Sequence, residues 1–247
     1  MSADQVIFGL HAVHSLLQHH GKLIIELQVS EQRSDERLTA IVSLAENSGV
    51  AVRYVSRAEL DKRANGARHQ GVVALCKQSP CYHEKDLPHL LDGLEEPPLL
   101  LILDGVTDPH NLGACLRSAD AAGVHAVIAP KDKAAGINAT VRKVACGAAE
   151  HIPFFQVTNL ARTLRVLQQR GVWLVGTEGE AESTLYQVDL NGPLGVVMGS
   201  EGKGLRRLTR EHCDLLIKIP MFGSVSSLNV SVATGVCLFE AVRQRHA

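Results

Sequence analysis

Few residues of this sequence are aromatic: Phe, Trp and Tyr make up 4% of the 247, so an aliphatic core is expected. No apolar run approaches the roughly 18–20 residues that a membrane-spanning helix needs. The first ten residues contain Asp4 and no basic residue, whereas a secretory signal peptide begins with a basic region. We therefore expect a cytoplasmic protein with no membrane partner.

The six cysteines include no Cys-x-x-Cys pair, and the twelve histidines show no metal-ligand spacing. Structural zinc sites depend on such spacings, so no metal is predicted. A disulfide framework is not expected in a chain of this length without an export signal, and we predict reduced thiols.

An excess of one charge is also missing, since the formal net charge is −1. This balance argues against a protein that holds nucleic acid by bulk charge, and leaves only local basic patches. The acids concentrate in residues 78–97, which hold five acidic residues, one basic residue and three prolines. Because prolines interrupt helices and strands, we predict a linker there, between domains at residues 1–77 and 98–247.

The N-terminal segment alternates between two hydrophobic periods. Helical spacing occurs at residues 10–17 and 35–48, and strand-like runs occur at 23–29, 51–55 and 71–75. This alternation predicts a small α/β domain.

The C-terminal segment has continuous apolar runs separated by helical stretches. Such runs are typical of strands buried on both faces, so we predict an α/β domain with a mostly parallel sheet flanked by helices. Ligands of such sheets bind at the carboxyl ends of the strands. The runs span residues 99–103, 124–129, 173–175, 195–198 and 215–219.

Three polar clusters follow these runs, and the first begins a helix. Asp108 can cap a helix whose first residue is Pro109, a position that suits proline. Asn111 then falls in the first turn, and Arg117 points away from the face that packs on the sheet. A capped helix with a solvated arginine would explain these residues equally well.

The second cluster is a glycine-rich loop, Gly199–Gly204. Its three glycines permit a tight backbone and close approach of a ligand. The loop is not a P-loop, because Val197 stands where the first glycine belongs and Gly204 follows the lysine. It could be an ordinary turn, but Glu201 places a carboxylate at the mouth of the sheet, where it needs a partner.

The third cluster lies between the last run and a final helix. Ser226 or Ser227 can cap this helix, but a cap does not explain a row of hydroxyls beside the Asn229 amide. Four residues have the spacing of a core-facing stripe on this helix. They are Leu228, Val232, Val236 and Phe239.

Together the clusters supply one fixed cation, one carboxylate and neutral hydrogen-bonding groups, with no strong nucleophile. Such a set can orient and polarise a substrate. The candidate catalytic residues are Asn111, Arg117, Glu201, Ser227 and Asn229.

Three segments resemble, in order, the motifs of the SpoU (TrmH-like) branch of the SPOUT RNA methyltransferases. They are residues 111–117 (NLGACLR), 197–204 (VMGSEGKG) and 219–230 (IPMFGSVSSLNV). The likeness covers essentially the whole chain, and it is greatest to members that methylate the 2′-hydroxyl of one guanosine in 23S ribosomal RNA.

The resemblance implies a deep C-terminal trefoil knot in the catalytic domain. It implies that S-adenosylmethionine binds around Thr177, Gly199, Ile219 and Leu228. It also implies a homodimer whose active site is completed near the subunit interface. The N-terminal domain would resemble ribosomal protein L30e and would help to hold the RNA.

Our hypothesis for the reaction follows from this resemblance. Arg117 meets the phosphate or the 2′-oxygen of the target nucleotide, and Glu201 orients Arg117 or neighbouring groups. The other three candidate catalytic residues fix the ribose. Family proposals make the arginine the base, but an arginine normally keeps its proton, so stabilising a developing 2′-oxyanion fits its chemistry better.

RNA binding would need local basic patches. The candidates are Arg63, Arg68 and His69 around the loop Asn65–Gly66, together with Arg142, Lys143, Arg206 and Arg207. Each of these could equally be a solvated surface residue.

Other functions remain open. A non-catalytic RNA-binding factor in ribosome assembly would not need to bind S-adenosylmethionine, and a tRNA 2′-O-methyltransferase would act on a different RNA. A serine hydrolase is disfavoured because the sequence has no Gly-x-Ser-x-Gly elbow.

Overall fold

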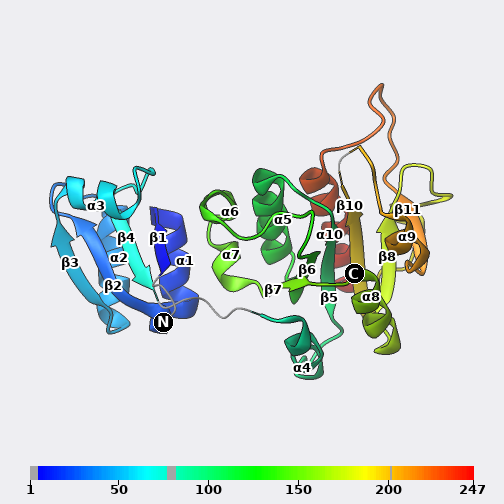
Figure 1. Ribbon diagram of the computed structural model, residues 1–247, viewed down its shortest axis with the longest axis horizontal. Coiled ribbons are helices and arrows are strands. Elements are labelled where there is room, and N and C mark those ends of the chain that lie inside the picture. The colour runs from blue at the N-terminus through cyan, green and yellow to red at the C-terminus, as the bar shows by residue number, and fades with distance from the viewer. Residues whose placement is uncertain (1–4, 77–81, 201) are drawn as a thin grey trace. The chain divides into compact units, whose positions relative to one another are not determined.

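The computed structural model describes residues 5–76, 82–200 and 202–247 (Figure 1). The chain divides into two compact units. The first contains the N-terminal residues to Cys81 and the short segment Cys146–His151. The second contains Tyr82–Ala145 and Ile152–Ala247. Among the described residues, no helix is both long and apolar enough to cross a membrane.

The first unit is built on a four-stranded sheet in the order β1-β4-β2-β3. Strand β4 is antiparallel to both of its neighbours, and β2 runs parallel to β3. The strands are β1 (Gln5–Phe8), β2 (Ile24–Ser30), β3 (Ala51–Val55) and β4 (Val72–Cys76). The helical elements are α1 (Leu10–His20), η1 (Gly21–Leu23), α2 (Glu36–Asn47) and α3 (Arg57–Arg63). The predicted helices and strands of this segment are confirmed, and β1 was not predicted.

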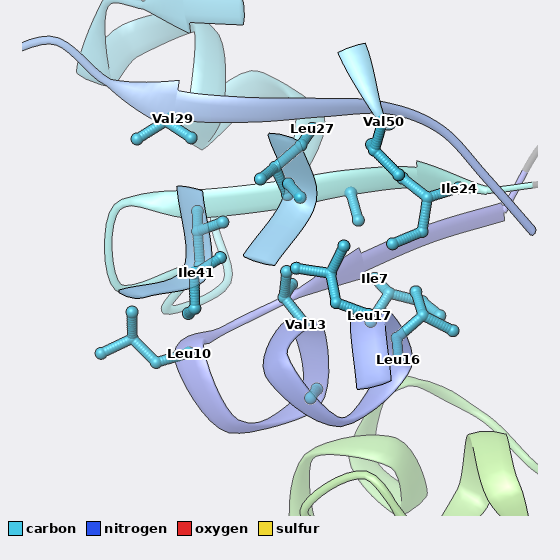
Figure 2. Packing of buried hydrophobic residues seen from close by; sticks show 14 of the residues in the cluster. Ile7, Leu10, Val13, Leu16, Leu17, Ile24, Leu27, Val29, Ile41 and Val50 are labelled. Carbon is cyan, nitrogen blue, oxygen red and sulfur yellow. The ribbon is translucent and has the colours of Figure 1, made fainter. Parts of the chain in front are cut away.

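The core of this unit lies between the sheet and helices α1 and α2 (Figure 2). Val13 and Leu16 of α1 are buried in the same cluster as Leu27 of β2 and Ile41 of α2. Each such side chain stabilises the fold by roughly 1.5–3 kcal/mol relative to an exposed one. The apolar residues with helical spacing and those in the predicted strands therefore pack together in one core.

The second unit contains a seven-stranded sheet in the order β7-β6-β5-β10-β8-β11-β9. Every pairing in it is parallel, which confirms the predicted sheet. The strands are β5 (Leu99–Asp104), β6 (Ala126–Pro130), β7 (Phe154–Val157), β8 (Trp173–Thr177), β9 (Ser183–Thr184), β10 (Leu194–Gly199) and β11 (Leu215–Lys218). Strands β7 and β9 were not predicted, because Gln156 interrupts the apolar run of β7 and β9 has only two residues, both polar.

Helices cover both faces of this sheet. Helices α4 and α8 pack over one face, where Leu87 and Leu164 join a cluster with Ile102 of β5 and Ile128 of β6. Helices α5 and α10 pack against each other, and α10 contacts β10. The helical elements are η2 (Glu84–Asp86), α4 (Leu87–Asp92), α5 (Pro109–Ala121), α6 (Ala139–Ala145), α8 (Leu160–Gln169), η3 (Leu185–Gln187), α9 (Arg207–Glu211) and α10 (Val230–Arg245). Helix α7 (Ala148–His151) belongs to the segment grouped with the first unit.

Much of the expected linker is folded. Residues 77–81 lie outside the described residues, but 82–97 include η2 and α4 and belong to the second unit. Glu84 makes an ion pair of 2.7 Å with Arg162 of α8, and Asp92 pairs with Arg170. Two of the five acids of the expected linker, Glu84 and Asp92, therefore have arginine partners in the second unit.

Helix α10 corrects one prediction. Val232 and Phe239, expected in the core, are 52% and 50% exposed. The buried face of this helix contains Val230, Cys237 and Leu238 instead. The helix has two apolar faces, and spacing alone cannot show which one meets the sheet.

Candidate active site

Segments at the carboxyl ends of β8, β10 and β11 form one pocket with a volume of about 690 Å³. A pocket at this edge of a parallel sheet agrees with the rule that ligands bind beyond the carboxyl ends of the strands. Residues that line it come from 177–180, 198–200, 202–205, 217–221 and 226–233.

All four predicted cofactor residues line this pocket: Thr177, Gly199, Ile219 and Leu228. Gly199 is tightly enclosed, because a Cβ atom there would lie 2.2 Å from the carbonyl carbon of Gly204. The loop is closed by two backbone hydrogen bonds of 3.0 Å between Ser200 and Gly204. At this point the wall of the pocket is therefore main chain packed against main chain.

Asn229 connects the pocket to helix α5. Its Oδ1 accepts hydrogen bonds from the backbone N–H of Ser231 (2.9 Å) and from the Ser231 hydroxyl (2.6 Å), so Asn229 caps α10. The predicted caps, Ser226 and Ser227, line the pocket and do not cap the helix. Because a backbone N–H can only donate, this cap fixes the orientation of the amide. The Asn229 Nδ2 therefore faces Asn111 and donates to its Oδ1 at 3.0 Å.

Asn111 is buried in the first turn of α5. The predicted cap is confirmed, since Asp108 accepts a hydrogen bond of 3.0 Å from the backbone of His110, and Pro109 is the first helical residue. These features place the Asn111 side chain beside the start of α10 and explain how two distant motifs meet.

The remaining two candidates are placed differently. Arg117 lies on the exposed side of α5 and is not among the residues that line the pocket. Glu201 lies outside the described residues. Within one chain, the described pocket therefore unites Ser227 and Asn229, with Asn111 hydrogen-bonded to Asn229, and Arg117 lies on the same helix as Asn111.

A buried carboxylate, which the sequence reasoning missed, holds the loop that leaves the pocket. Asp104 ends β5 and is fully buried. Its Oδ2 accepts a hydrogen bond of 2.8 Å from the backbone N–H of Arg206, and its Oδ1 lies 3.3 Å from the Arg206 Nε. The sequence did offer a signal for this role: Asp104 follows a run of apolar residues in a buried strand, and a buried carboxylate needs a partner.

Charged groups of both signs line the pocket. Glu178 is paired with Arg210 at 2.8 Å, and Glu180, Lys203 and Lys218 also contribute. Because ammonium and carboxylate groups are both present, the lining can accommodate a zwitterionic ligand.

The nearby Cys213 is not a reactive thiolate. Burial, followed by the charges of Asp214, Asp104 and Glu178, raises the pKa of its thiol to about 12. Among the described residues, no group of three His, Cys, Asp or Glu side chains could hold a metal ion. The amide, hydroxyl and charged groups that line the pocket suit the positioning of a ligand and the placement of charge.

The predicted RNA-binding residues have unequal environments. Arg63 and Arg68 are exposed, and Arg142 is half-buried on α6. His69 is buried, with Nδ1 accepting from the Gly71 backbone at 3.1 Å and Nε2 lying 3.0 Å from Asp61. His69 therefore shapes its loop. Arg206 lies against Asp104, as described above, which gives it a structural partner.

Comparison with known proteins identifies the class. The model of the SpoU rRNA Methylase family matches residues 98–239, and a model for RNA 2′-O ribose methyltransferase substrate binding matches residues 6–81. The chain belongs to the SpoU rRNA methylase family.

Particular relatives are similar over nearly the whole chain. The 23S rRNA (guanosine-2′-O-)-methyltransferase RlmB of Pectobacterium atrosepticum is 62% identical, with 98% of this chain and 99% of the relative covered. The RlmB of Escherichia coli K12 is 59% identical, with the same coverage.

The solved structures agree on the fold. A crystal structure of an RNA 2′-O ribose methyltransferase matches with a TM-score of 0.79 and 27% identity, covering 99% of this chain and 90% of that chain. The SpoU methyltransferase AviRb from Streptomyces viridochromogenes, in complex with AdoMet, matches with a TM-score of 0.78 and 24% identity, covering 98% and 90%.

Proposed function

We propose that this protein transfers the methyl group of S-adenosylmethionine to the ribose 2′-hydroxyl of a guanosine in 23S ribosomal RNA. The observation that carries this function is the pocket at the strand ends, which is lined by the four cofactor candidates together with Ser227 and Asn229. The 59–62% identity to RlmB proteins supports the choice of RNA and nucleotide.

The pocket fits S-adenosylmethionine in size and chemistry. Its volume of about 690 Å³ lies in the usual range of roughly 300–1,000 Å³ for small-molecule sites. The absence of a side chain at Gly199 lets a ligand approach the main chain closely, and Thr177, Ile219 and Leu228 complete the wall. When bound, the cofactor supplies a methyl group that is already activated by its sulfonium.

The protein's own residues then have to align the acceptor. Methyl transfer needs the 2′-oxygen at about 3–3.5 Å from the methyl carbon in near-attack geometry. We assign the fixing of the ribose to Asn111, Ser227 and Asn229, because the hydrogen bond between the two asparagines pre-orients their amides. Arg117 stabilises the negative charge that develops on the 2′-oxygen, and Glu201 orients Arg117.

A homodimer completes this arrangement. Val232 and Phe239 are exposed on α10 and Val236 is half-buried, and this apolar stripe supports a second copy of the chain as its cover. The exposed position of Arg117 on α5, the helix packed against α10, suits a role near that interface.

The remaining features of the proposal concern fold and location. We assign a deep trefoil knot to the C-terminal domain, supported by the close passage of Gly204 beside Gly199 and by the return of α10 to α5. We place an L30e-like RNA-binding domain at residues 1–77 and the catalytic domain at 98–247. Arg63, Arg68, Arg142 and Arg206 are candidate RNA contacts, and the protein acts in the cytoplasm.

Transfer of radiolabelled methyl from S-adenosylmethionine to unmodified 23S rRNA tests the proposal. Mapping of the 2′-O-methyl groups on the product should show modification at a single guanosine. Arg117→Ala should lower kcat/KM by about 10²–10³-fold, as expected when a transition-state donor is lost. Absence of transfer by the wild type, or an undiminished rate in Arg117→Ala, would contradict it.

A further inference from the structure

A second pocket lies entirely within the first unit, at the end of β2 and the start of α3. Its volume is about 520 Å³, which is also within the range of roughly 300–1,000 Å³ for small-molecule sites. The residues that line it are Ser30, Gln32, Arg33, Arg57, Asp61 and the loop 66–71. None of these residues belongs to the pocket at the strand ends.

The loop that forms one wall is held in an unusual backbone conformation. Three of its residues and the preceding Asn65 have positive φ: Asn65 (51°), Gly66 (74°), Gln70 (54°) and Gly71 (81°). For a residue other than glycine this costs on the order of 1–3 kcal/mol, and it persists only where the surroundings enforce it. Such backbone is concentrated at ligand sites.

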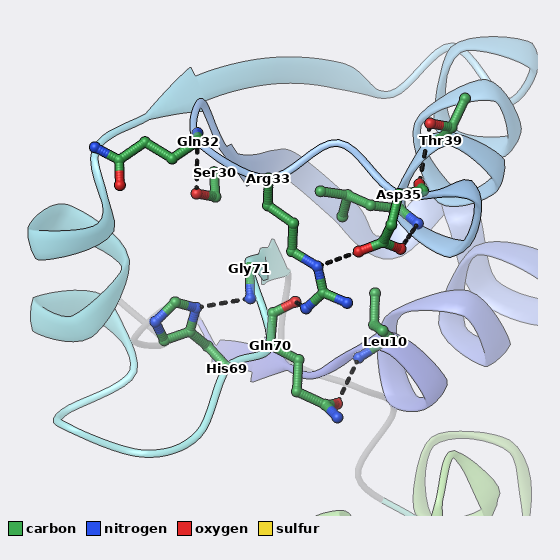
Figure 3. A network of polar contacts seen from close by, with 10 residues as sticks. Leu10, Ser30, Gln32, Arg33, Asp35, Thr39, His69, Gln70 and Gly71 are labelled. Atoms are coloured by element: carbon green, nitrogen blue, oxygen red, sulfur yellow. Dashed lines mark hydrogen bonds and ion pairs between the residues drawn. The ribbon is translucent and has the colours of Figure 1, made fainter.

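Side chains behind the loop supply that enforcement (Figure 3). His69 is buried and bonded at both ring nitrogens, as described above. The Gln70 Oε1 accepts from the Leu10 backbone N–H at 3.2 Å. Arg33 donates to the Gln70 carbonyl and pairs with Asp35, so its guanidinium is committed to holding the loop. The pocket is therefore formed before any ligand binds.

Two other arginines are available at the pocket. The Arg57 side chain is 77% exposed, and its contact with Asp61, at 4.0 Å, is a weak surface pair. Within the described parts of the chain, no hydrogen bond or ion pair engages the Arg68 side chain, which is exposed. Guanidinium groups bind phosphate oxygens with paired, charge-assisted hydrogen bonds.

Gln32 gives the pocket a neutral recognition group. Its backbone N–H donates to the Ser30 hydroxyl at 3.3 Å, which fixes the turn, and its side chain is exposed and points away from the network in Figure 3. An amide both donates and accepts, as do the edges of unpaired bases.

We propose that this pocket binds one unpaired nucleotide of the substrate RNA. Arg57 and Arg68 hold its phosphate, and Gln32 contacts the edge of its base. The proposal rests on the proposed function for the identity of the RNA, and it adds a nucleotide subsite, with its specificity-determining residue, that is separate from the methyl-transfer pocket.

Binding and kinetics of the full-length protein test the phosphate contacts. Arg57→Ala and Arg68→Ala should each raise KM for an unmodified 23S rRNA fragment about tenfold, with kcat unchanged. With single-stranded RNA octamers, each variant should lower the slope of log affinity against log salt by about 0.7. The control is Arg37→Ala, an exposed arginine on α2 outside the pocket, which should match the wild type. Equal KM and slope in all four proteins would overturn the proposal.

Base recognition is tested with labelled octamers of A, C and U. Gln32→Ala should reduce the differences in affinity among the three octamers, while its salt slope stays that of the wild type. A wild type that transfers no methyl group would defeat the proposed function, whereas the octamer measurements would still test the pocket. Octamer affinities unaffected by changes at positions 32, 57 and 68 would defeat the pocket alone.

Discussion

The Asn229 side chain both caps α10 and donates a hydrogen bond to Asn111, which lies 118 positions earlier in the sequence. The two bonds use opposite ends of one amide, and the backbone N–H of Ser231 decides which end faces which partner. The starts of α5 and α10 are thus fixed to each other by a group that also lines the proposed active site.

Because this hydrogen bond runs from Asn229 to Asn111, replacing each asparagine by Asp should have unequal effects on stability. Asn111→Asp keeps the acceptor that Asn229 needs, whereas Asn229→Asp keeps the cap but turns an acceptor toward the Asn111 oxygen. We expect Asn229→Asp to lower the free energy of unfolding by about 1–3 kcal/mol, and Asn111→Asp to lower it by less. Urea titrations of both variants measure this difference. Equal losses would mean that the bond has no fixed direction.

Asp104 should matter more than the side chain with which it pairs. Asp104→Ala removes the acceptor of the Arg206 backbone N–H, while Arg206→Ala retains that N–H and loses only the half-exposed guanidinium. We expect Asp104→Ala to cost about 2 kcal/mol of stability and to weaken S-adenosylmethionine binding, because the loop from Gly199 to Arg206 loses its anchor.

Calorimetric titration with S-adenosylmethionine and urea unfolding test this expectation. Arg206→Ala is the matched variant and should show the smaller change in both measurements. Cofactor affinity that is unaltered in Asp104→Ala would show that the anchor does not shape the pocket.

The proposed homodimer, with the outward stripe of α10 at its interface, predicts how a charge on that stripe would change the oligomeric state. Phe239→Glu should shift the protein from dimer to monomer, since a carboxylate buried without a partner at an interface is costly. Tyr54→Glu, at an exposed aromatic residue on β3, is the control and should remain dimeric. Light scattering coupled to size-exclusion chromatography distinguishes the outcomes, and a dimeric Phe239→Glu protein would exclude this face from the interface.

The hydrogen bonds of the Glu240 carboxylate should make a pH-dependent contribution to the free energy of unfolding. Hydrogen bonds from Arg243 and then Gln244 lower the pKa of its carboxyl from 4.5 to about 2. Since the folded-state pKa is depressed, the contribution is complete above pH 4.5 and is lost as the pH falls toward 2.

Glu240→Gln should therefore cost up to about 1 kcal/mol at pH 7, a modest value because Arg243 is mostly exposed. The difference from the wild type should shrink as the pH is lowered below 4.5. Urea midpoints measured across this range check the sign, and a difference that grows on acidification would refute it.

The parts of the fold that could be predicted from the sequence are those where a residue pattern is compatible with only one structure. Continuous apolar strands must be covered on both faces, so the parallel sheet followed from the runs. Asp108 before Pro109 allowed little besides a capped helix, and the structure has that helix. The pocket followed in turn, because residues after parallel strands gather at one edge.

Other features depended on information that no single segment contains. The Val232 and Phe239 spacing identified an apolar face but not the partner of that face. The segment 82–97 resembled a linker in part because Arg162 and Arg170, the partners of Glu84 and Asp92, lie far along the chain. The cap of α10 was placed at a serine, whereas Asn229 forms it, because the competing residues are adjacent and equally suited.

The backbone wall at Gly199 limits how this enzyme class can be redesigned. A ligand at this wall contacts main-chain atoms, which no amino-acid substitution can replace. Any side chain added at Gly199 would collide with the backbone of Gly204. Acceptance of bulkier cofactor analogues would have to arise by rerouting the segment, through the turn glycines Gly202 (φ 75°) and Gly204 (φ 64°). Directed evolution toward such analogues should therefore favour insertions and conformational changes over point replacements in the wall.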